Sequence, residues 1–240
     1  MEGDYAIVVE DVYKAYIVGS VVTWALSGVN LKVGRGDFIS VMGPSGSGKT
    51  TLLNLIGLID RPTKGKVYID GVDTSELGDR ELAEFRNRKI GFVFQAFNLV
   101  NRLTVLENIE LPLIARGLSR DERRRRSIEA LVKVGGDMSW IYKKPNQLSG
   151  GQQQRVAIAR AIAGSPSILL ADEPTGNLDS ASARVVVSTF MELNKFGQTV
   201  VLITHNPEVA NCSQRIYVLR DGRIAGTLNP DPGKCLIYSK

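Results

Sequence analysis

Residues 43–50 read Gly-Pro-Ser-Gly-Ser-Gly-Lys-Thr, which matches the phosphate-binding pattern G-x-x-x-x-G-K-[ST]. Glycines let such a loop wrap around a phosphate so that backbone N–H groups point inward, and the dipole of a following helix favours the negative charge. Lys49 can then reach the terminal phosphates, and the Thr50 hydroxyl can bind Mg²⁺. Phosphate contacts are expected from Gly43, Ser45, Gly46, Ser47, Gly48, Lys49, Thr50 and Thr51.

Two carboxylates follow an apolar segment later in the chain. Residues 168–171 read Ile-Leu-Leu-Ala, and Asp172 and Glu173 come directly after them. A strand here would deliver both side chains to the carboxyl edge of a sheet, where α/β proteins bind ligands. Asp172 suits a magnesium-binding role, and Glu173 is the candidate base for an attacking water. An acidic pair also caps helices, so this signal becomes strong only beside the phosphate-binding loop.

A second glycine-containing motif, Leu-Ser-Gly-Gly-Gln, occupies residues 148–152. Ser149 and Gln152 match a helix-capping box, so a helix is predicted to begin here. Capping does not explain Gly150 and Gly151, because each glycine costs about 1 kcal/mol relative to alanine inside a helix. A backbone left open for an anion explains the two glycines better.

The order of these three motifs resembles the ATP-binding-cassette (ABC) family over essentially the whole chain. The resemblance implies ATP and Mg²⁺ as cofactors. It implies catalytic roles for Glu173, His205 and Gln95, and magnesium contacts from Thr50, Gln95 and Asp172. Further nucleotide contacts are implied for Tyr16 (with Tyr13 as the competing adenine-stacking residue), Ser149, Gly150, Gly151, Gln152 and Asp179.

The same resemblance has consequences for partners. It implies an ATP-dependent head-to-tail homodimer, in which Ser149 and Gly151 of one copy cover the ATP held by Lys49 and Thr50 of the other. Transmembrane permease subunits are expected to be separate chains, because no apolar run approaches the roughly 20 residues of a membrane helix. We therefore expect a peripheral protein at the cytoplasmic face of the cell membrane.

Finer motifs at residues 91–95, 97–99, 103–108, 144–147 and 171–179 resemble the lipoprotein-release and macrolide-efflux branch of the family. This branch implies an exporter or a system that handles lipids, lipoproteins or peptides. Asn206 and Gly136 depart from the residues common in the family at those positions. One alternative is an ATPase that drives transenvelope signalling without cargo. A nucleic-acid-associated ATPase fits less well, because the chain between Lys49 and Ala171 is too short for the coiled coils of that class.

Composition supports a globular protein and excludes several classes of site. The 240 residues are 43% hydrophobic and 23% charged, with a net charge of +5. The basic surplus gathers in residues 116–126, which lack the interleaved aromatic residues needed to stack bases, so a solvated helix face is favoured and no nucleic-acid partner is expected. His205 is the single histidine, which excludes a histidine-based metal cage. Cys212 and Cys235 are too few for a disulfide scaffold and favour reduced thiols in the cytosol.

Alternating strand and helix patterns position these residues. Strands are expected at 38–42, 90–94, 168–171 and 199–203, with short extended segments before residue 42, a hairpin signal at Asp70-Gly71 and a final hairpin over 215–225. Helices are expected at 150–163, at 181–195 and in an apolar pattern that reaches Ile59; capping boxes begin two more at Thr104 and Ser119.

The pattern predicts an α/β fold: a P-loop NTPase (RecA-like) core with a mostly parallel sheet, an antiparallel β subdomain and an inserted α-helical subdomain. We expect one ABC ATPase domain over 1–240. Within it, residues 1–95 and 148–240 would form the catalytic core with the β subdomain, and residues 96–147 the helical subdomain.

Overall fold

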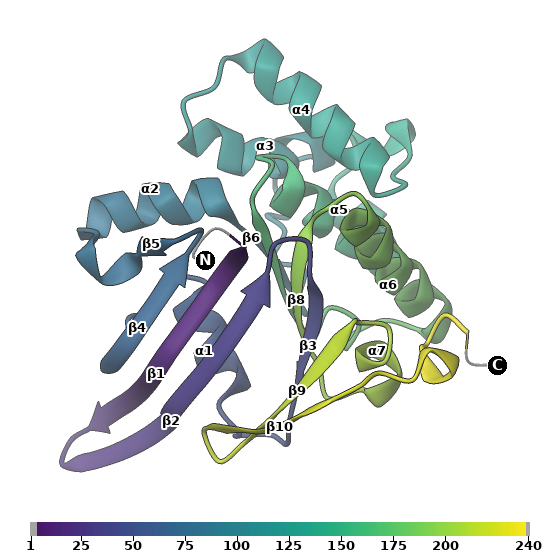
Figure 1. Cartoon of the computed structure of the whole chain (residues 1–240). Coiled ribbons are helices and arrows are strands. Elements are labelled where there is room, and N and C mark those ends of the chain that lie inside the picture. The colour runs from purple at the N-terminus through teal and green to yellow at the C-terminus, as the bar shows by residue number, and fades with distance from the viewer. Residues whose placement is uncertain (1–3, 239–240) are drawn as a thin grey trace.

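A six-stranded, mostly parallel sheet forms the centre of the computed structural model, which describes residues 4–238 (Figure 1). The strand order is β10-β9-β3-β8-β7-β6, and β10 runs antiparallel to β9. These strands are β3 (Phe38–Met42), β6 (Ile90–Phe94), β7 (Ile168–Asp172), β8 (Thr199–Ile203), β9 (Arg215–Arg220) and β10 (Arg223–Leu228). The α/β fold class is thereby confirmed, and β10 extends beyond the predicted hairpin.

A smaller antiparallel sheet has the order β2-β1-β4-β5. Its strands are β1 (Tyr5–Val18), β2 (Val21–Gly34), β4 (Lys64–Ile69) and β5 (Val72–Asp73). The prediction of short segments before residue 42 is wrong, because β1 and β2 each run for 14 residues. Asp11 (φ 47°) and Gly28 (φ 77°) lie at shifts in the β1–β2 register, so bulges absorb residues that resemble turns in the sequence.

Helices cover both faces of the central sheet (Figure 1). They are α1 (Lys49–Ile56), α2 (Asp79–Lys89), α3 (Val105–Ala115), α4 (Arg120–Lys133), α5 (Gly150–Ile162), α6 (Ser180–Lys195) and α7 (Pro207–Ala210), with 3-10 turns at η1 (Thr74–Glu76), η2 (Met138–Trp140), η3 (Pro145–Gln147) and η4 (Pro232–Lys234). Among residues 4–238, no helix combines the length and apolar character needed to cross a bilayer. Helix α1 ends before Ile59, which is 50% exposed, so the predicted apolar pattern is one turn too long.

Alternate residues of the central strands face two separate hydrophobic cores, as the period of two in a strand requires. One core joins the sheet to α3, α4, α5 and α6. The other joins it to α1 and the smaller sheet. The sheet residues divide into Leu169, Ala171, Val200 and Leu202 in the first core and Ile168, Leu170, Val201 and Ile203 in the second.

The arginine-rich helix α4 forms ion pairs along its own surface. Arg125 contacts both Glu122 and Glu129, and Arg126 contacts Glu122. Glu122 accepts these hydrogen bonds, so the predicted box at Ser119 is only half formed: the Ser119 hydroxyl accepts from Glu122 N–H without the reciprocal bond. The box at Thr104 is complete. The self-paired charges agree with the solvated-face interpretation of this stretch.

Asp70 connects the two sheets. It lies in the turn between β4 and β5, where its nearly buried carboxylate accepts from Lys89 and Ser167 and pairs with Arg35. Burial raises the pKa of Asp70, but the hydrogen bonds from Lys89 and Ser167 and the charges of Lys89 and Arg35 outweigh burial and lower it overall. Because the folded pKa is below the unfolded value of 3.8, the ionised carboxylate stabilises the fold above that pH, and this contribution is lost as pH falls through the folded pKa.

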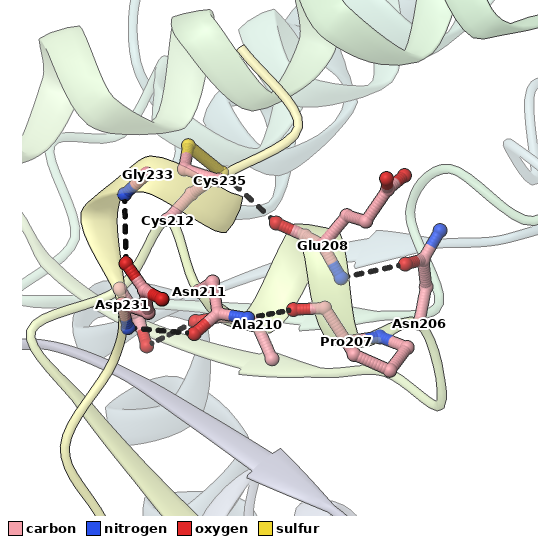
Figure 2. Close-up of a disulfide and its surroundings, with 10 residues drawn as sticks. Asn206, Pro207, Glu208, Ala210, Asn211, Cys212, Asp231, Gly233 and Cys235 are labelled. Carbon is pink, nitrogen blue, oxygen red and sulfur yellow. Dashed lines mark hydrogen bonds between the residues drawn. A yellow bond between two sulfur atoms is a disulfide. The ribbon is translucent and has the colours of Figure 1, made fainter. Parts of the chain in front are cut away.

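The two cysteines form a disulfide, which contradicts the prediction of reduced thiols (Figure 2). Cys212 follows α7 and Cys235 follows η4, and their Cα atoms lie 4.7 Å apart. The two cysteines are 23 residues apart with the β9–β10 hairpin between them, and this spacing gives no sequence signal for their approach. The chain path from β10 back across α7 creates the pairing.

The Asp70 junction can be tested by Asp70→Asn. We expect the free energy of unfolding at pH 7 to fall by about 2 kcal/mol, because partly exposed cations lose a buried anionic partner. Asp221→Asn is the matched control. Asp221 also has a left-handed φ (49°, against 51° for Asp70) and precedes a glycine, but its side chain is exposed. Urea unfolding should show less than about 0.5 kcal/mol for the control. Equal losses in the two variants would contradict the role of Asp70.

Candidate functional site

A cavity of about 630 Å³ opens at the carboxyl ends of β3, β6, β7 and β8. Because these strands are parallel, the residues that follow each strand meet at one edge of the sheet. The cavity is lined by Ala25, Gly43, Pro44, Ser45, Gly46, Gly48, Lys49, Thr50, Thr51, Gln95, Asp172, Glu173 and His205. Most of the residues that the sequence singled out therefore come together, although they derive from four separate segments.

The loop between β3 and α1 forms one wall of the cavity. Lys49 Nζ donates to the carbonyl oxygens of Gly43 and Pro44, each at 2.8 Å, which holds the ammonium group over the loop. Gly48 has a φ of 101°, and a Cβ there would lie 2.5 Å from the carbonyl oxygen of Ala25. Glycine is thus required at Gly48 for both its conformation and its close approach to β2.

Ser47 lies behind the loop surface. It is buried, and its hydroxyl has no hydrogen-bond partner among the described residues. Ser47 is not part of the cavity lining, so its hydroxyl does not face the cavity. The loop glycines and the Lys49 ammonium group do line the cavity, and they fit a bound phosphate chain.

Glu173 and His205 meet at the cavity edge. His205 Nδ1 lies 2.8 Å from Glu173 Oε1, with 72% of the histidine side chain and 17% of the glutamate side chain exposed. The Glu173 N–H donates to the carbonyl of Ile203 at 2.9 Å, so the backbone after β7 is tied to β8. Glu173 has a φ of 45°, a left-handed conformation that costs on the order of 1 kcal/mol for a residue with a Cβ.

Asp172 lies beside this pair at the end of β7. Its pKa is raised, first because it is partly removed from water and second because of the negative charge of Glu173; the positive charge of Lys49 opposes these effects. Two adjacent carboxylates with one nearby ammonium group make a site that favours an added cation.

The residues present fit Mg²⁺ only together with phosphate oxygens. No group of three or more His, Cys, Asp or Glu side chains in residues 4–238 could hold a metal ion by itself. Thr50, Gln95 and Asp172 line the cavity and offer the hard oxygen donors that Mg²⁺ prefers. With so few protein ligands, the remaining positions would be filled by phosphate and water, which is usual for this ion.

Asn177 positions Gln95, a contact that sequence analysis missed. Gln95 Nε2 donates to Asn177 Oδ1, and Asn177 Nδ2 donates to the carbonyl of Gln95, both at 3.1 Å. A Cβ at Gly176 would lie 2.6 Å from Gln95 Nε2, so glycine is needed for this approach. The only available signal was the position of Asn177 shortly after the two acidic residues.

Several predicted site residues lie outside the cavity. Ser149 and Gln152 form the predicted capping box of α5, and Asp179 caps α6 by accepting from Ser182 N–H at 2.9 Å and Ser182 Oγ at 2.7 Å. A Cβ on Gly151 would lie 2.8 Å from Ser182 Cβ. The tight packing of α5 against α6 therefore also requires glycine at position 151, independently of any bound anion. The predicted residues absent from the described cavity lining are Tyr16, Ser47, Ser149, Gly150, Gly151, Gln152 and Asp179.

Tyr16 is the predicted adenine-stacking residue. Its hydroxyl donates to Asp60 Oδ2 at 3.2 Å, and the Lys14 ammonium lies 5.1 Å from its ring centre. The ring is 40% exposed, on the strand that leads towards the hairpin tip. Tyr13 instead packs edge-on against Trp24, which leaves Tyr16 as the more accessible of the two rings.

Comparison with known proteins gives the chain its family. The ABC transporter family matches residues 26–176. The chain is 50% identical to the lipoprotein-releasing system ATP-binding protein LolD of Anaeromyxobacter dehalogenans, over 89% of this chain and 90% of that protein. It is also 50% identical to the macrolide export ATP-binding/permease protein MacB of Syntrophobacter fumaroxidans, over 90% of this chain but 30% of that protein.

A solved relative has the same fold. The ABC transporter cassette MJ0796 of Methanocaldococcus jannaschii, described as dimeric, has a TM-score of 0.86 and 49% identity and covers 94% of this chain and 99% of its own. A second structure of MJ0796 is described as a post-hydrolysis dimer bound to ADP and phosphate. These matches agree with the lipoprotein-release and macrolide-efflux motifs in the sequence. The chain therefore belongs to the ABC transporter family and is one of its ATP-binding cassettes, an ATPase.

Proposed function

We propose that this cassette binds ATP in the cavity at the carboxyl edge of the central sheet and hydrolyses it to power a membrane permease. The observation that carries the proposal is the Glu173–His205 contact opposite the loop that holds Lys49. The loop that would bind the phosphates and the Glu173 carboxylate that would orient the water thus line the same cavity.

The catalytic roles follow from the chemistry of the side chains. Glu173 is the group that orients the attacking water and accepts its proton. His205 holds the Glu173 carboxylate through Nδ1 and turns the rest of its ring towards the position of the terminal phosphate. Gln95, held by Asn177, is placed to contact the water and the metal ion.

The remaining residues bind and orient the nucleotide. Lys49 and the backbone N–H groups of the loop bind the phosphates, and Thr51 extends this wall of the cavity. Bound Mg²⁺, held by Thr50, Gln95 and Asp172, would neutralise negative charge on the phosphates. Tyr16 supplies the aromatic surface for the adenine.

ATP-dependent head-to-tail dimerisation explains the residues that lie outside the cavity. Ser149, Gly151 and Asp179 cap or begin helices whose first residues do not line the cavity of their own chain. In a head-to-tail pair these ends would cover the ATP held by the other copy. The MJ0796 cassette is described as dimeric, which supports dimerisation of this chain.

The partners are separate transmembrane permease subunits, docked at the cytoplasmic face of the cell membrane. The similarity to LolD and MacB supports an exporter or a system that handles lipids, lipoproteins or peptides. The self-paired arginines of α4 support the absence of a nucleic-acid partner.

Glu173→Gln tests the base and the dimer together. We expect turnover to fall by about 10²-fold or more, because the amide cannot accept the proton, while ATP binding persists. ATP and Mg²⁺ should therefore trap a dimer, measured by size-exclusion chromatography with light scattering. Glu192→Gln, at an exposed site on α6, is the matched control and should behave like the parent chain. A Glu173→Gln variant that stays monomeric in ATP and Mg²⁺ would refute the dimer.

His205→Ala tests the histidine. Steady-state ATPase assays should show most turnover lost, about 10²-fold, because the Glu173 carboxylate loses its partner and the phosphate its contact. Fluorescent-nucleotide titration should show nearly unchanged affinity, since the loop that carries Lys49 is intact. Near-normal turnover would reject the assigned role of His205.

A further inference from the structure

Helix α7 begins two residues after His205 and is held by the C-terminal segment, defined here as residues 229–238 (Figure 2). The Leu236 N–H donates to the Glu208 carbonyl at 2.9 Å, in the first turn of α7. The Asp231 N–H donates to Asn211 Oδ1 at 2.8 Å, at the other end. The Cys212–Cys235 disulfide closes the same interface. A helix of four residues does not persist alone, and α7 is held by these contacts together with the fully buried Val209 of the first hydrophobic core.

Short-range contacts connect α7 to the histidine. Asn206 Oδ1 accepts from Glu208 N–H at 2.8 Å, and the Asn206 N–H donates to the buried Thr204 hydroxyl at 3.0 Å. Asn206 is therefore set by the start of α7, whereas the Thr204 N–H donates to the carbonyl of Val41 in β3. The exposed His205 ring has Glu173 as its partner, so the backbone must supply the rest of its positioning.

We propose that the Cys212–Cys235 disulfide is a redox-controlled positioning element for His205, an inference that rests on the proposed ATPase mechanism. With the disulfide closed, the C-terminal segment holds α7, and α7 holds His205 against Glu173. With the disulfide open, α7 loosens and turnover slows, whereas nucleotide binding by the loop at Lys49 is unchanged. Neither cysteine touches the reacting atoms.

The redox step is thiol–disulfide exchange with a small-molecule disulfide such as glutathione disulfide. One thiolate attacks the glutathione disulfide and releases one glutathione, and the second thiolate then displaces the other glutathione from the mixed disulfide. The Cys212–Cys235 bond forms as the glutathione disulfide bond breaks, and the two cysteine protons end on the two glutathione thiols. Cys212 and Cys235 are only 8% and 1% exposed, so exchange requires the C-terminal segment to lift first.

The test compares the full chain oxidised with glutathione disulfide and reduced with a phosphine, each state being verified by intact mass. We expect reduction to lower the melting temperature by about 10 °C, the effect of opening a loop of this length in a chain of this size. Well below both transitions, kcat should fall roughly 3- to 10-fold with KM unchanged, because small misplacements of a catalytic side chain cost up to about 100-fold. Cys212→Ser/Cys235→Ser should match the reduced parent under both conditions.

A second arm separates positioning from simple stabilisation. In His205→Ala, reduction should still lower the melting temperature but leave the residual kcat unchanged, because the residue through which the disulfide acts is gone. Three results would overturn the inference. The first is that the two thiols fail to form a disulfide with glutathione disulfide, the second that the kcat of the parent chain is the same in both states, and the third that reduction lowers kcat equally in His205→Ala. If His205→Ala itself retains full turnover, the proposed mechanism fails instead.

Discussion

The hydrogen bond from Glu173 N–H to the carbonyl of Ile203 is the constraint on which this edge of the cavity depends. It joins the ends of β7 and β8, and with it the two segments that carry Glu173 and His205. The ends of two neighbouring parallel strands stay level only if buried side chains hold the register of the strands. Both faces of this sheet are buried, so the β7–β8 register is held from both sides. The two hydrophobic cores therefore set the 2.8 Å contact between histidine and glutamate.

Contacts between loops then extend this edge outward. Asn177 joins Gln95 to the segment after β7, and Ser182 joins the start of α5 to the start of α6 through Gly151 and Asp179. The nucleotide loop is different, because its lysine is held by carbonyl oxygens of its own backbone. One side of the cavity is thus a network across several segments, whereas on the other side Lys49 is held by its own loop.

The sequence predicts best those features that depend on residues close together in the chain. The loop around Lys49, the strand ending at Asp172 and the capping box at Ser149 each depend on neighbours in the chain, and the structure places them as expected. Contacts between distant segments were missed. Asn177 beside Gln95 and Cys212 beside Cys235 become neighbours only through chain topology, which residue spacing does not encode. Bulges at Asp11 and Gly28 misled the strand prediction because turns use the same residues.

The left-handed backbone conformation of Glu173 limits the amino acids that can replace it without strain. Glycine, asparagine and aspartate tolerate this conformation best, yet the first carries no side chain and the other two are one methylene shorter than glutamate. Valine and isoleucine are excluded by sterics alone. Position 173 thus holds a residue that the local backbone disfavours. If Glu173 is the base that we propose, a lineage that no longer needs hydrolysis should replace it with glycine or asparagine before the surrounding fold changes.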